Sequence, residues 1–403
     1  MAFGTFVFFV LFSFLLFLFG VCTIAVFKKD STAVFTPPIS VVIPVYNESK
    51  NIVACLDSIR ACTYPGEVEM IVVDDGSTDD SVALAKAHGA RVLNQNHGGK
   101  VEALNNGIKE SVHDFVITID ADTVVNDQFL TEIMRPFAES DVVATSGAAK
   151  VKNKHTFLGS FQNVEYHHNN LLGSSFSKVF NTGTWFMGAL AAYRKSTMEE
   201  VGYFKKDTIT EDMDIVLEFK QKGYRTINVA KAFGYTNVPN TVKGFIHQRT
   251  RWWLGVLQAL KKNQGSWFRK DIPTSFLFIN QWWWTMYAFI SFPLIAYQVH
   301  FWFPQEGIVQ AGAYLFRWFS VVGPFYVLYK LPEWGINIYN IFGVMSGILS
   351  LIVVFRALQY YGERLTLKNI AVITFYFPYT IFLNVVICLS ILTARFQPKH
   401  FIK

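Results

Sequence analysis

The chain has 403 residues, of which 51% are hydrophobic, 16% are aromatic and only 16% are charged. Soluble proteins carry about 25% charged residues, so this composition, with a mean hydropathy of +0.27, argues against a wholly soluble protein. The net charge of +6 is modest, and no basic stripe alternates with stacking aromatics, so no nucleic acid is expected as a partner. The charged residues crowd into the middle of the chain, which predicts a soluble domain between membrane segments.

The first apolar segment covers residues 3–27 and carries no charge. It is long enough to cross roughly 30 Å of hydrocarbon as a helix. A cleaved signal peptide would need a basic start and a small-residue cleavage site, and this segment has neither. It ends at Lys28-Lys29, which by the positive-inside rule places the following chain in the cytoplasm. We therefore predict an N-terminal transmembrane helix over residues 1–30.

A soluble α/β domain is predicted over residues 38–240. Short apolar runs alternate there with helical patterns, which is typical of a parallel sheet built from βα units. The expected strands are 39–45, 68–73, 90–94 and 115–119, and the expected helices are 49–60, 78–88, 100–110 and 211–220. Ligands bind beyond the carboxyl ends of the strands in such sheets, and acidic residues follow two of these strands.

The chain becomes apolar again after about residue 240. Residues 241–270 contain an amphipathic, Trp-containing helix with basic residues, which suits a bilayer interface. About four transmembrane helices are expected in residues 271–403, near 275–298, 307–329, 338–357 and 370–393. Four spans would place Arg356, Arg364 and Lys368 outside, against the positive-inside rule, so one of the four could instead be re-entrant or interfacial.

Two acidic motifs follow predicted strands. In Asp120-Ala121-Asp122 both carboxylates point the same way if the backbone stays extended, as a site for a metal ion and a diphosphate requires; the alternative is a cap for the next helix. Asp74-Asp75-Gly76-Ser77 either forms a turn with a helix cap or contacts the ribose and base of a nucleotide.

Three further motifs complete the candidate chemistry. Gly98-Gly99-Lys100 opens a helix and suits a phosphate. Thr210-Glu211-Asp212 either caps a helix or provides a general base, Asp212. Gln248-Arg249-Thr250-Arg251-Trp252 combines cations for phosphate with an aromatic face for a sugar.

These motifs in this order resemble the processive family-2 glycosyltransferases, which include the cellulose, chitin, hyaluronan and poly-N-acetylglucosamine synthases. The resemblance runs from about Val41 to Trp253 and includes Pro44-Val45-Tyr46-Asn47-Glu48. Within the family, the segments 209–214 and 238–244 are most similar to the bacterial poly-N-acetylglucosamine synthases. Those enzymes usually carry Ser-Gly where this chain has Met187-Gly188, which leaves the acceptor and the sugar open.

The resemblance implies a GT-A-type fold: a Rossmann-like, mainly parallel α/β domain in the cytoplasm, joined to an α-helical transmembrane region. It also implies a role for each motif residue. Donor binding falls on Tyr46, Glu48, Asp74, Asp75, Lys100, Asp120, Gln248, Arg249 and Arg251. A Mg²⁺ or Mn²⁺ ion would be held by Asp122 and Asp120. Asp212 would be the catalytic base, and the acceptor would contact Trp252, Glu211 and Gly188.

The function implied is an inverting, processive β-glycosyltransferase of the plasma membrane that polymerises a sugar, N-acetylglucosamine by preference, from a UDP-sugar and exports the polymer. Its partners would be the donor, a growing glycan or lipid acceptor, membrane lipid and a small accessory membrane subunit. The alternatives are a hyaluronan- or cellulose-type product and transfer of one sugar to a lipid. A catalytically silent scaffold is disfavoured, because it has no need of a metal pair plus a base.

Overall fold

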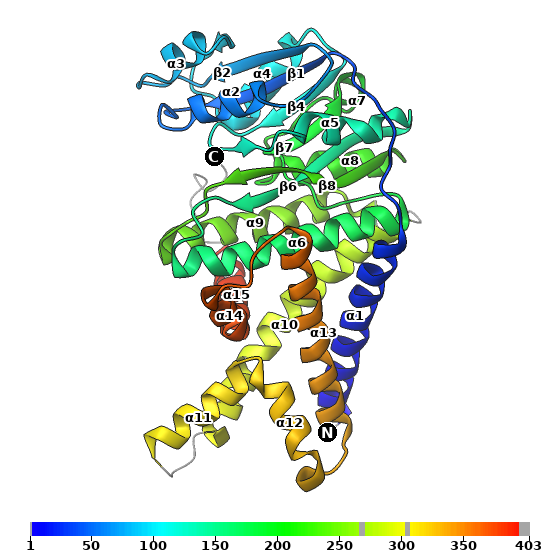
Figure 1. Ribbon diagram of the computed structural model, residues 1–403, viewed down its shortest axis with the longest axis vertical. Coiled ribbons are helices and arrows are strands. Elements are labelled where there is room, and N and C mark those ends of the chain that lie inside the picture. The colour runs from blue at the N-terminus through cyan, green and yellow to red at the C-terminus, as the bar shows by residue number, and fades with distance from the viewer. Residues whose placement is uncertain (1, 266–270, 303–306, 395–403) are drawn as a thin grey trace.

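The computed structural model has an α/β domain above a bundle of helices (Figure 1) and describes residues 2–265, 271–302 and 307–394. Residues 266–270 of the predicted interface segment, and residues 303–306 and 395–403 of the predicted C-terminal membrane region, lie outside the described residues.

The domain is organised around an eight-stranded sheet in the order β3-β2-β1-β4-β7-β6-β8-β5. Pairing is parallel from β3 to β4 and between β6 and β8, and antiparallel for β4–β7, β7–β6 and β8–β5. The predicted α/β domain is therefore confirmed, but its sheet is mixed, because β7 enters antiparallel between β4 and β6. The strands are β1 (Ile39–Val45), β2 (Val68–Asp74), β3 (Arg91–Asn94), β4 (Phe115–Ile119), β5 (Val124–Val125), β6 (Val142–Val151), β7 (Leu190–Arg194) and β8 (Arg225–Thr236).

Helices cover both faces of this sheet and bury two apolar cores. On one face lie α2 (Ile52–Arg60), α3 (Ser81–Ala87) and α5 (Phe129–Met134), the last followed by a short 3₁₀ turn, Arg135–Ala138. The other face is covered by α4 (Lys100–Glu110), α7 (Lys195–Val201) and α8 (Glu211–Gln221). Alternate residues of β1 enter the two cores, as a strand's two-residue period requires.

Two longer helices, α6 (Phe157–Phe180) and α9 (Val242–Lys262), form a layer between the sheet and the membrane-type helices (Figure 1). Each begins at a threonine N-cap: Thr156 accepts from the amide of Gly159, and Thr241 from that of Gly244. These caps satisfy amides that the first turn of a helix leaves unpaired. The predicted amphipathic helix corresponds to α9.

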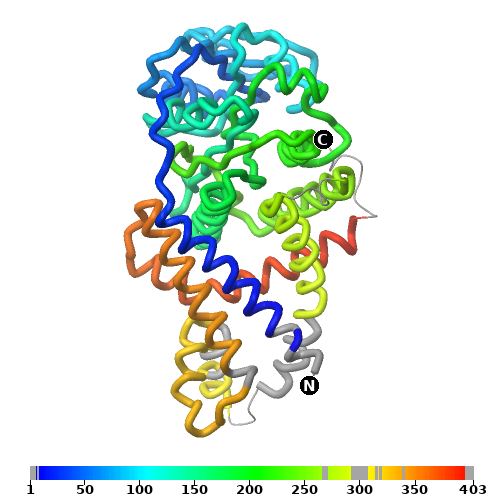
Figure 2. Tube along the Cα trace, turned by 90° about the vertical axis from the view of Figure 1, so that its right-hand side faces the viewer, coloured from blue at the N-terminus to red at the C-terminus, as the bar shows by residue number. Residues whose placement is uncertain are grey.

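The helical region consists of α1 (Ala2–Phe27), α10 (Ile272–Trp302), α11 (Ile308–Phe319), α12 (Val322–Trp334), α13 (Ile338–Tyr360), α14 (Leu367–Thr374) and α15 (Tyr376–Thr393). Three stretches of the described residues are long and apolar enough to cross a membrane: Phe9–Phe27, Ile341–Tyr360 and Tyr376–Thr393. Figure 2 shows α1 and α13 side by side, and their phenyl rings Phe12 and Phe342 stack at 5.0 Å.

The predicted apolar segment 307–329 is not one helix. It divides into α11 and α12 at Ser320–Val321, and each part is shorter than the roughly 20 residues needed to cross a bilayer. Proline at 324 gives the reason: inside a continuous helix its ring would clash with the carbonyl four residues earlier, that of Ser320. At the start of a new helix the same ring is tolerated.

The basic residues that follow α13 lie against the α/β domain. Lys368 donates to the carbonyl oxygens of Lys154 and His155, and Glu363 binds Lys154 at 2.7 Å. The carboxyl end of α13 is therefore on the same side of the helical bundle as the end of α1 and Lys28-Lys29 (Figure 1). This placement removes the conflict with the positive-inside rule that four full spans would create for Arg364 and Lys368.

Candidate active site

Three adjacent parallel strands, β2, β1 and β4, end at one edge of the sheet, and the predicted donor residues follow these ends. Tyr46 comes directly after β1, Asp74 and Asp75 stand at the end of β2, and Asp120 follows β4. The structure therefore brings these residues together at the carboxyl ends of the strands, as the sequence predicted.

Asp74 and Asp75 make different contacts. Asp74 accepts a hydrogen bond from the amide of Ser77 (3.1 Å), as the turn interpretation requires. Asp75 accepts from the amides of Gly98 (2.7 Å) and Gly99 (2.9 Å), and thereby holds the loop before α4. Burial acts to raise the pKa of Asp75, but these hydrogen bonds outweigh it and keep the pKa below its usual value.

An aromatic pair stands beside this loop. The rings of Tyr46 and His97 have their centroids 4.6 Å apart, and Tyr46 is 49% exposed. The imidazole of His97 is also 2.9 Å from Asp75. His97 was not predicted from the sequence, although it directly precedes the Gly98-Gly99-Lys100 motif. An exposed ring pair of this kind can stack a planar base.

Lys100 connects motifs that are far apart in the chain. Gly99, the N-cap of α4, has a φ of +89°, a conformation that favours glycine. The Lys100 ammonium lies 2.7 Å from Asp120 at the end of β4 and 3.8 Å from Glu211 at the start of α8. Burial acts to lower the pKa of Lys100, but Asp120 and Glu211 outweigh it and hold the pKa above its usual value.

Asp122 has no helix to cap, because the next element is the short strand β5. Burial raises its pKa, and the nearby charges of Asp120 and Glu48 raise it further. A cation would relieve this crowding of carboxylates, so Asp120 and Asp122 fit a divalent ion. Among the residues that the structure describes, no three His, Cys, Asp or Glu side chains group as a metal site. The chain would thus leave part of the ligand shell to substrate phosphates, as is common for Mg²⁺.

Asp212 is held by backbone amides. Its Oδ2 accepts from the amide of Gly188 (2.8 Å) and its Oδ1 from that of Met213 (2.8 Å). The carbonyl of Gly188 in turn accepts from Thr118 of β4 (2.7 Å). A Cβ at residue 188 would lie only 2.9 Å from the Cβ of Asp212, so the close approach requires glycine. The cap interpretation of this motif is not supported, because the Thr210 side chain makes no capping hydrogen bond.

The helix that carries the last motif, α9, packs directly on the Thr210-Glu211-Asp212 segment. A Cβ at Gly255 would meet the Thr210 side chain at 2.5 Å, so the two backbones approach closely only because residue 255 is glycine. The Gln258 side chain accepts from the amide of Ile209 at 3.1 Å. These contacts place the two motifs in one rigid unit.

The residues of the Gln248–Trp252 motif separate into buried and exposed ones. Arg249 is only 7% exposed and pairs with Glu165 of α6 at 2.9 Å, with its guanidinium over the ring of Trp252. It therefore lies in the α6–α9 interface, and its expected contact with the donor stays a prediction. Gln248 has a buried side-chain oxygen with no hydrogen-bond partner in the described part of the chain. Arg251 is exposed.

Trp252 is 37% exposed and lies next to Tyr166 of α6, with ring centroids 6.2 Å apart. Burial raises the pKa of Tyr166 to about 12, and Asp122 is close enough to add to this effect. Tyr166 thus lies beside the exposed tryptophan, next in sequence to Glu165. Neither Tyr166 nor Glu165 was predicted from the sequence, because no motif covers α6.

Known proteins resemble this chain in sequence and in fold. Residues 40–202 match the model of glycosyl transferase family 2. The chain is 30% identical over 236 residues to a poly-beta-1,6-N-acetyl-D-glucosamine synthase of Staphylococcus epidermidis, a match that covers 56% of each chain. It is 30% identical over 255 residues, 60% of each chain, to the synthase of the same name from Staphylococcus aureus. The matches span little more than half the length of these relatives.

Solved structures share the fold, among them one that covers nearly the whole chain. It is a mannosyltransferase from Pyrobaculum calidifontis in complex with GDP-Man and Mn²⁺, with a TM-score of 0.60, 20% identity, and coverage of 89% of this chain and 99% of that one. The α/β domain therefore has a GT-A-like fold, and its sequence is similar to glycosyltransferases. Residues 40–202 are a glycosyl transferase family 2 domain.

Proposed function

We propose that the protein is an inverting, processive membrane β-glycosyltransferase that polymerises N-acetylglucosamine from its UDP-linked donor and exports the product. The observation that carries the proposal is the position of the Lys100 ammonium between Asp120 and Glu211. Lys100 thereby contacts both the donor-side motif, which contains Asp120, and the acceptor-side motif, which contains Glu211. The 30% identity to the two staphylococcal synthases supports the choice of sugar.

In this mechanism the donor's base stacks near Tyr46 and His97, and Asp75 holds the adjoining loop. The diphosphate lies near Lys100, whose positive charge is secured by the surrounding carboxylates. Asp120 and Asp122 would hold Mg²⁺ or Mn²⁺, which when bound neutralises charge on the departing nucleotide.

On the acceptor side, Asp212 takes the proton of the attacking hydroxyl. The Gly188 and Met213 amides fix its two oxygens, so the carboxylate needs no reorientation. Glu211 and Gly188 border the acceptor, and the exposed face of Trp252 stacks on its sugar ring. Gln248 and Arg251 complete the diphosphate contacts.

We also propose the arrangement in the cell: a plasma-membrane protein with its catalytic domain in the cytoplasm. The basic residues support this orientation. Lys28 and Lys29 directly follow α1, and Arg364 and Lys368 lie near Lys154 and His155 of the α/β domain. The proposed partners are the UDP-sugar, a growing glycan, membrane lipid and a small accessory membrane subunit.

A second candidate is the transfer of a single sugar to a lipid acceptor. It is favoured by the number of candidate spans after Trp252 in the described residues, which is two: Ile341–Tyr360 and Tyr376–Thr393. A polymer channel enclosed by this chain alone needs several spans.

One experiment separates these candidates. Purified full-length protein in lipid vesicles is incubated with a panel of UDP-sugars, and the products are sized. A β-linked N-acetylglucosamine polymer supports processive synthesis, a product one sugar long supports the alternative, and no transfer from any UDP-sugar contradicts both. Excess EDTA should stop the reaction, and full activity in EDTA would remove the metal role from Asp120 and Asp122.

Replacement of the base gives a sharper test. Asp212→Asn should abolish transfer and leave binding of the UDP-sugar intact in calorimetry, because only proton removal is lost. Asp57→Asn, at an exposed carboxylate on α2, is the matched control. Normal turnover in the Asp212 variant would contradict the assignment.

A further inference from the structure

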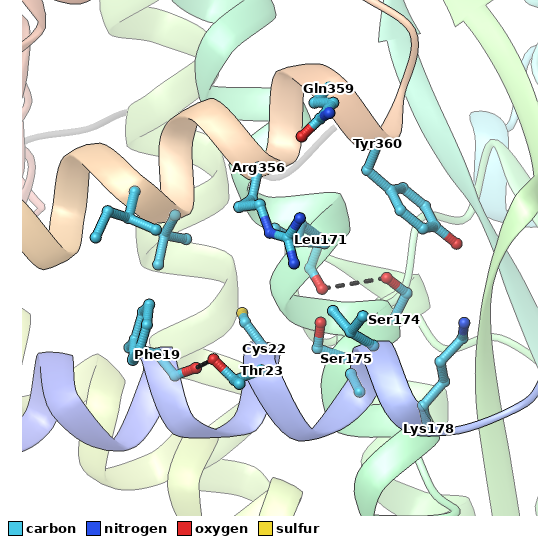
Figure 3. A pocket seen from close by; sticks show the side chains of 14 residues that line it. Phe19, Cys22, Thr23, Leu171, Ser174, Ser175, Lys178, Arg356, Gln359 and Tyr360 are labelled. Carbon is cyan, nitrogen blue, oxygen red and sulfur yellow. Dashed lines mark hydrogen bonds between the residues drawn. The ribbon is translucent and has the colours of Figure 1, made fainter.

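A cavity of about 480 Å³ lies between α1, α6 and α13, on the opposite side of α6 from the sheet. Its volume falls in the range of small-molecule sites, roughly 300–1,000 Å³. Figure 3 shows its walls: Phe19, Cys22 and Thr23 from α1, Leu171, Ser174 and Ser175 from α6, and residues of α13 above them. None of the proposed donor or acceptor residues lines it.

The cavity has an apolar body and a basic end. Phe19, Val26, Ile352 and Val353 contribute carbon surface along two of the three candidate membrane spans. Lys178 and Tyr360 lie at the end where α1 leaves for the α/β domain, and Arg356 projects into the middle of the cavity (Figure 3). Sugars and nucleotides present polar groups throughout, so the body suits a hydrocarbon chain instead.

Arg356 is the side chain that most clearly indicates a ligand in this cavity. It lies within the candidate span Ile341–Tyr360, is exposed, and projects from α13 toward the cavity (Figure 3). Across the described residues no carboxylate forms an ion pair with it. A charged side chain at membrane depth is costly and normally pairs or reaches the headgroup region.

The surroundings of Arg356 are positively charged. Lys178 pairs with Asp30 at 2.5 Å, and the same carboxylate also pairs with Lys231 at 3.0 Å. Lys28 and Lys29 stand exposed at the end of α1. One carboxylate thus faces several cations, at the level where two candidate spans end and lipid headgroups begin.

We propose that this cavity binds an anionic glycerophospholipid, with an acyl chain between α1 and α13 and the phosphate at Arg356. The lipid would join α1, at the start of the chain, to α13 and to α6, the helix that carries Glu165 and Tyr166. The site does not depend on which sugar the enzyme transfers.

The test uses delipidated full-length protein in detergent. Native mass spectrometry measures the binding of dioleoyl-phosphatidylglycerol and of dioleoyl-phosphatidylcholine in separate titrations. We expect the anionic lipid to bind more tightly by about five-fold, the effect of one basic residue on an anionic headgroup. Arg356→Gln should remove this preference.

Two further variants separate the headgroup from the chain. Arg364→Gln removes the same charge beyond the end of α13, outside the cavity, and should retain the preference. Thr23→Phe, at an exposed position on the cavity wall, should weaken binding of both lipids. Glycerol 3-phosphate at millimolar concentration should not displace the lipid.

Four results would overturn the proposal. The wild-type protein could bind the two lipids equally tightly, or the Arg356 and Arg364 variants could lose the preference for the anionic lipid equally. The Thr23 variant could bind lipid as tightly as wild type, or glycerol 3-phosphate could displace the lipid.

Discussion

Gly188 and Asp212 are in such close contact that a single methyl group added at residue 188 should displace the Asp212 side chain. In Gly188→Ala the new Cβ would lie 2.9 Å from the Cβ of Asp212 and 3.2 Å from its Oδ2. Gly188 is not among the glycines with positive φ in the described residues, so alanine fits the backbone there. The perturbation is therefore steric and falls on the proposed base.

The size of the effect follows from these distances. Carbon atoms in contact prefer a separation of about 3.5–4.0 Å, so Asp212 must retreat by about 0.6 Å or more. A misplacement of about 1 Å at a reacting group can lower a rate by about 100-fold. We expect kcat to fall by about 10- to 100-fold, while the KM for the UDP-sugar changes little, because the donor contacts lie on other elements.

The assay is release of UDP by the full-length protein in vesicles, with thermal unfolding measured on the same samples. Gly173→Ala is the matched control, because a Cβ there would meet its nearest neighbour, Trp185, at an ordinary 3.5 Å. A Gly188→Ala enzyme with wild-type kcat would refute the reasoning. So would an equal loss of activity in the control.

Three other substitutions test separate parts of the molecule. Trp252→Ala should shorten the product and slow transfer by about tenfold, because an aromatic contact of about 1.5 kcal/mol is lost; an unchanged product length would argue against acceptor stacking. Glu165→Gln should destabilise the protein by about 3–5 kcal/mol, because it leaves the buried charge of Arg249 unpaired, and a melting temperature within a degree of wild type would contradict this. Glu363→Gln tests the pH dependence of stability. The hydrogen bond from His167 and, next, the interaction with Lys154 lower the pKa of Glu363 from 4.5 to about 2, although burial acts to raise it. A lowered pKa stabilises the folded state above pH 4.5 and ceases to do so as the pH falls toward 2. The variant should therefore be less stable than wild type at neutral pH, by at most about 3 kcal/mol. The melting temperatures of variant and wild type should converge as the pH falls toward 2. A stability difference that stays constant across this pH range would exclude the Glu363 ion pair as its source.

Several elements could be predicted closely because their signals are local. The strands β1 and β4 and the helix α4 have the predicted bounds. Each strand is a short apolar run bounded by turn residues, and α4 begins at a Gly-Gly pair. The helices α2 and α3 begin three residues later than predicted, because the preceding loops are tied together: the Glu48 amide donates to Ser81 and the Ser49 amide to Asp79.

Helix α6 was missed for a physical reason. Its buried positions mix polar residues, which include Ser160, Gln162, Asn163 and His167, with apolar ones such as Phe161 and Val164, so its apolar period is interrupted. Two of them bond to distant segments: the Gln162 side chain donates to the carbonyl of Pro239, and the His167 ring bonds to Glu363. Such partners exist only once the chain has folded.

The sequence alone therefore determined the class of domain, the strand ends that carry the acidic motifs and the apolar segments, because apolar periodicity, turn residues and motif order act over short stretches. Tertiary structure decided the rest. It paired Arg249 with Glu165, 84 residues away, placed Gly188 against Asp212, and turned Arg356 toward a cavity formed by α1, α6 and α13. Contacts between distant residues depend on how helices and strands pack, and a linear pattern does not record that packing.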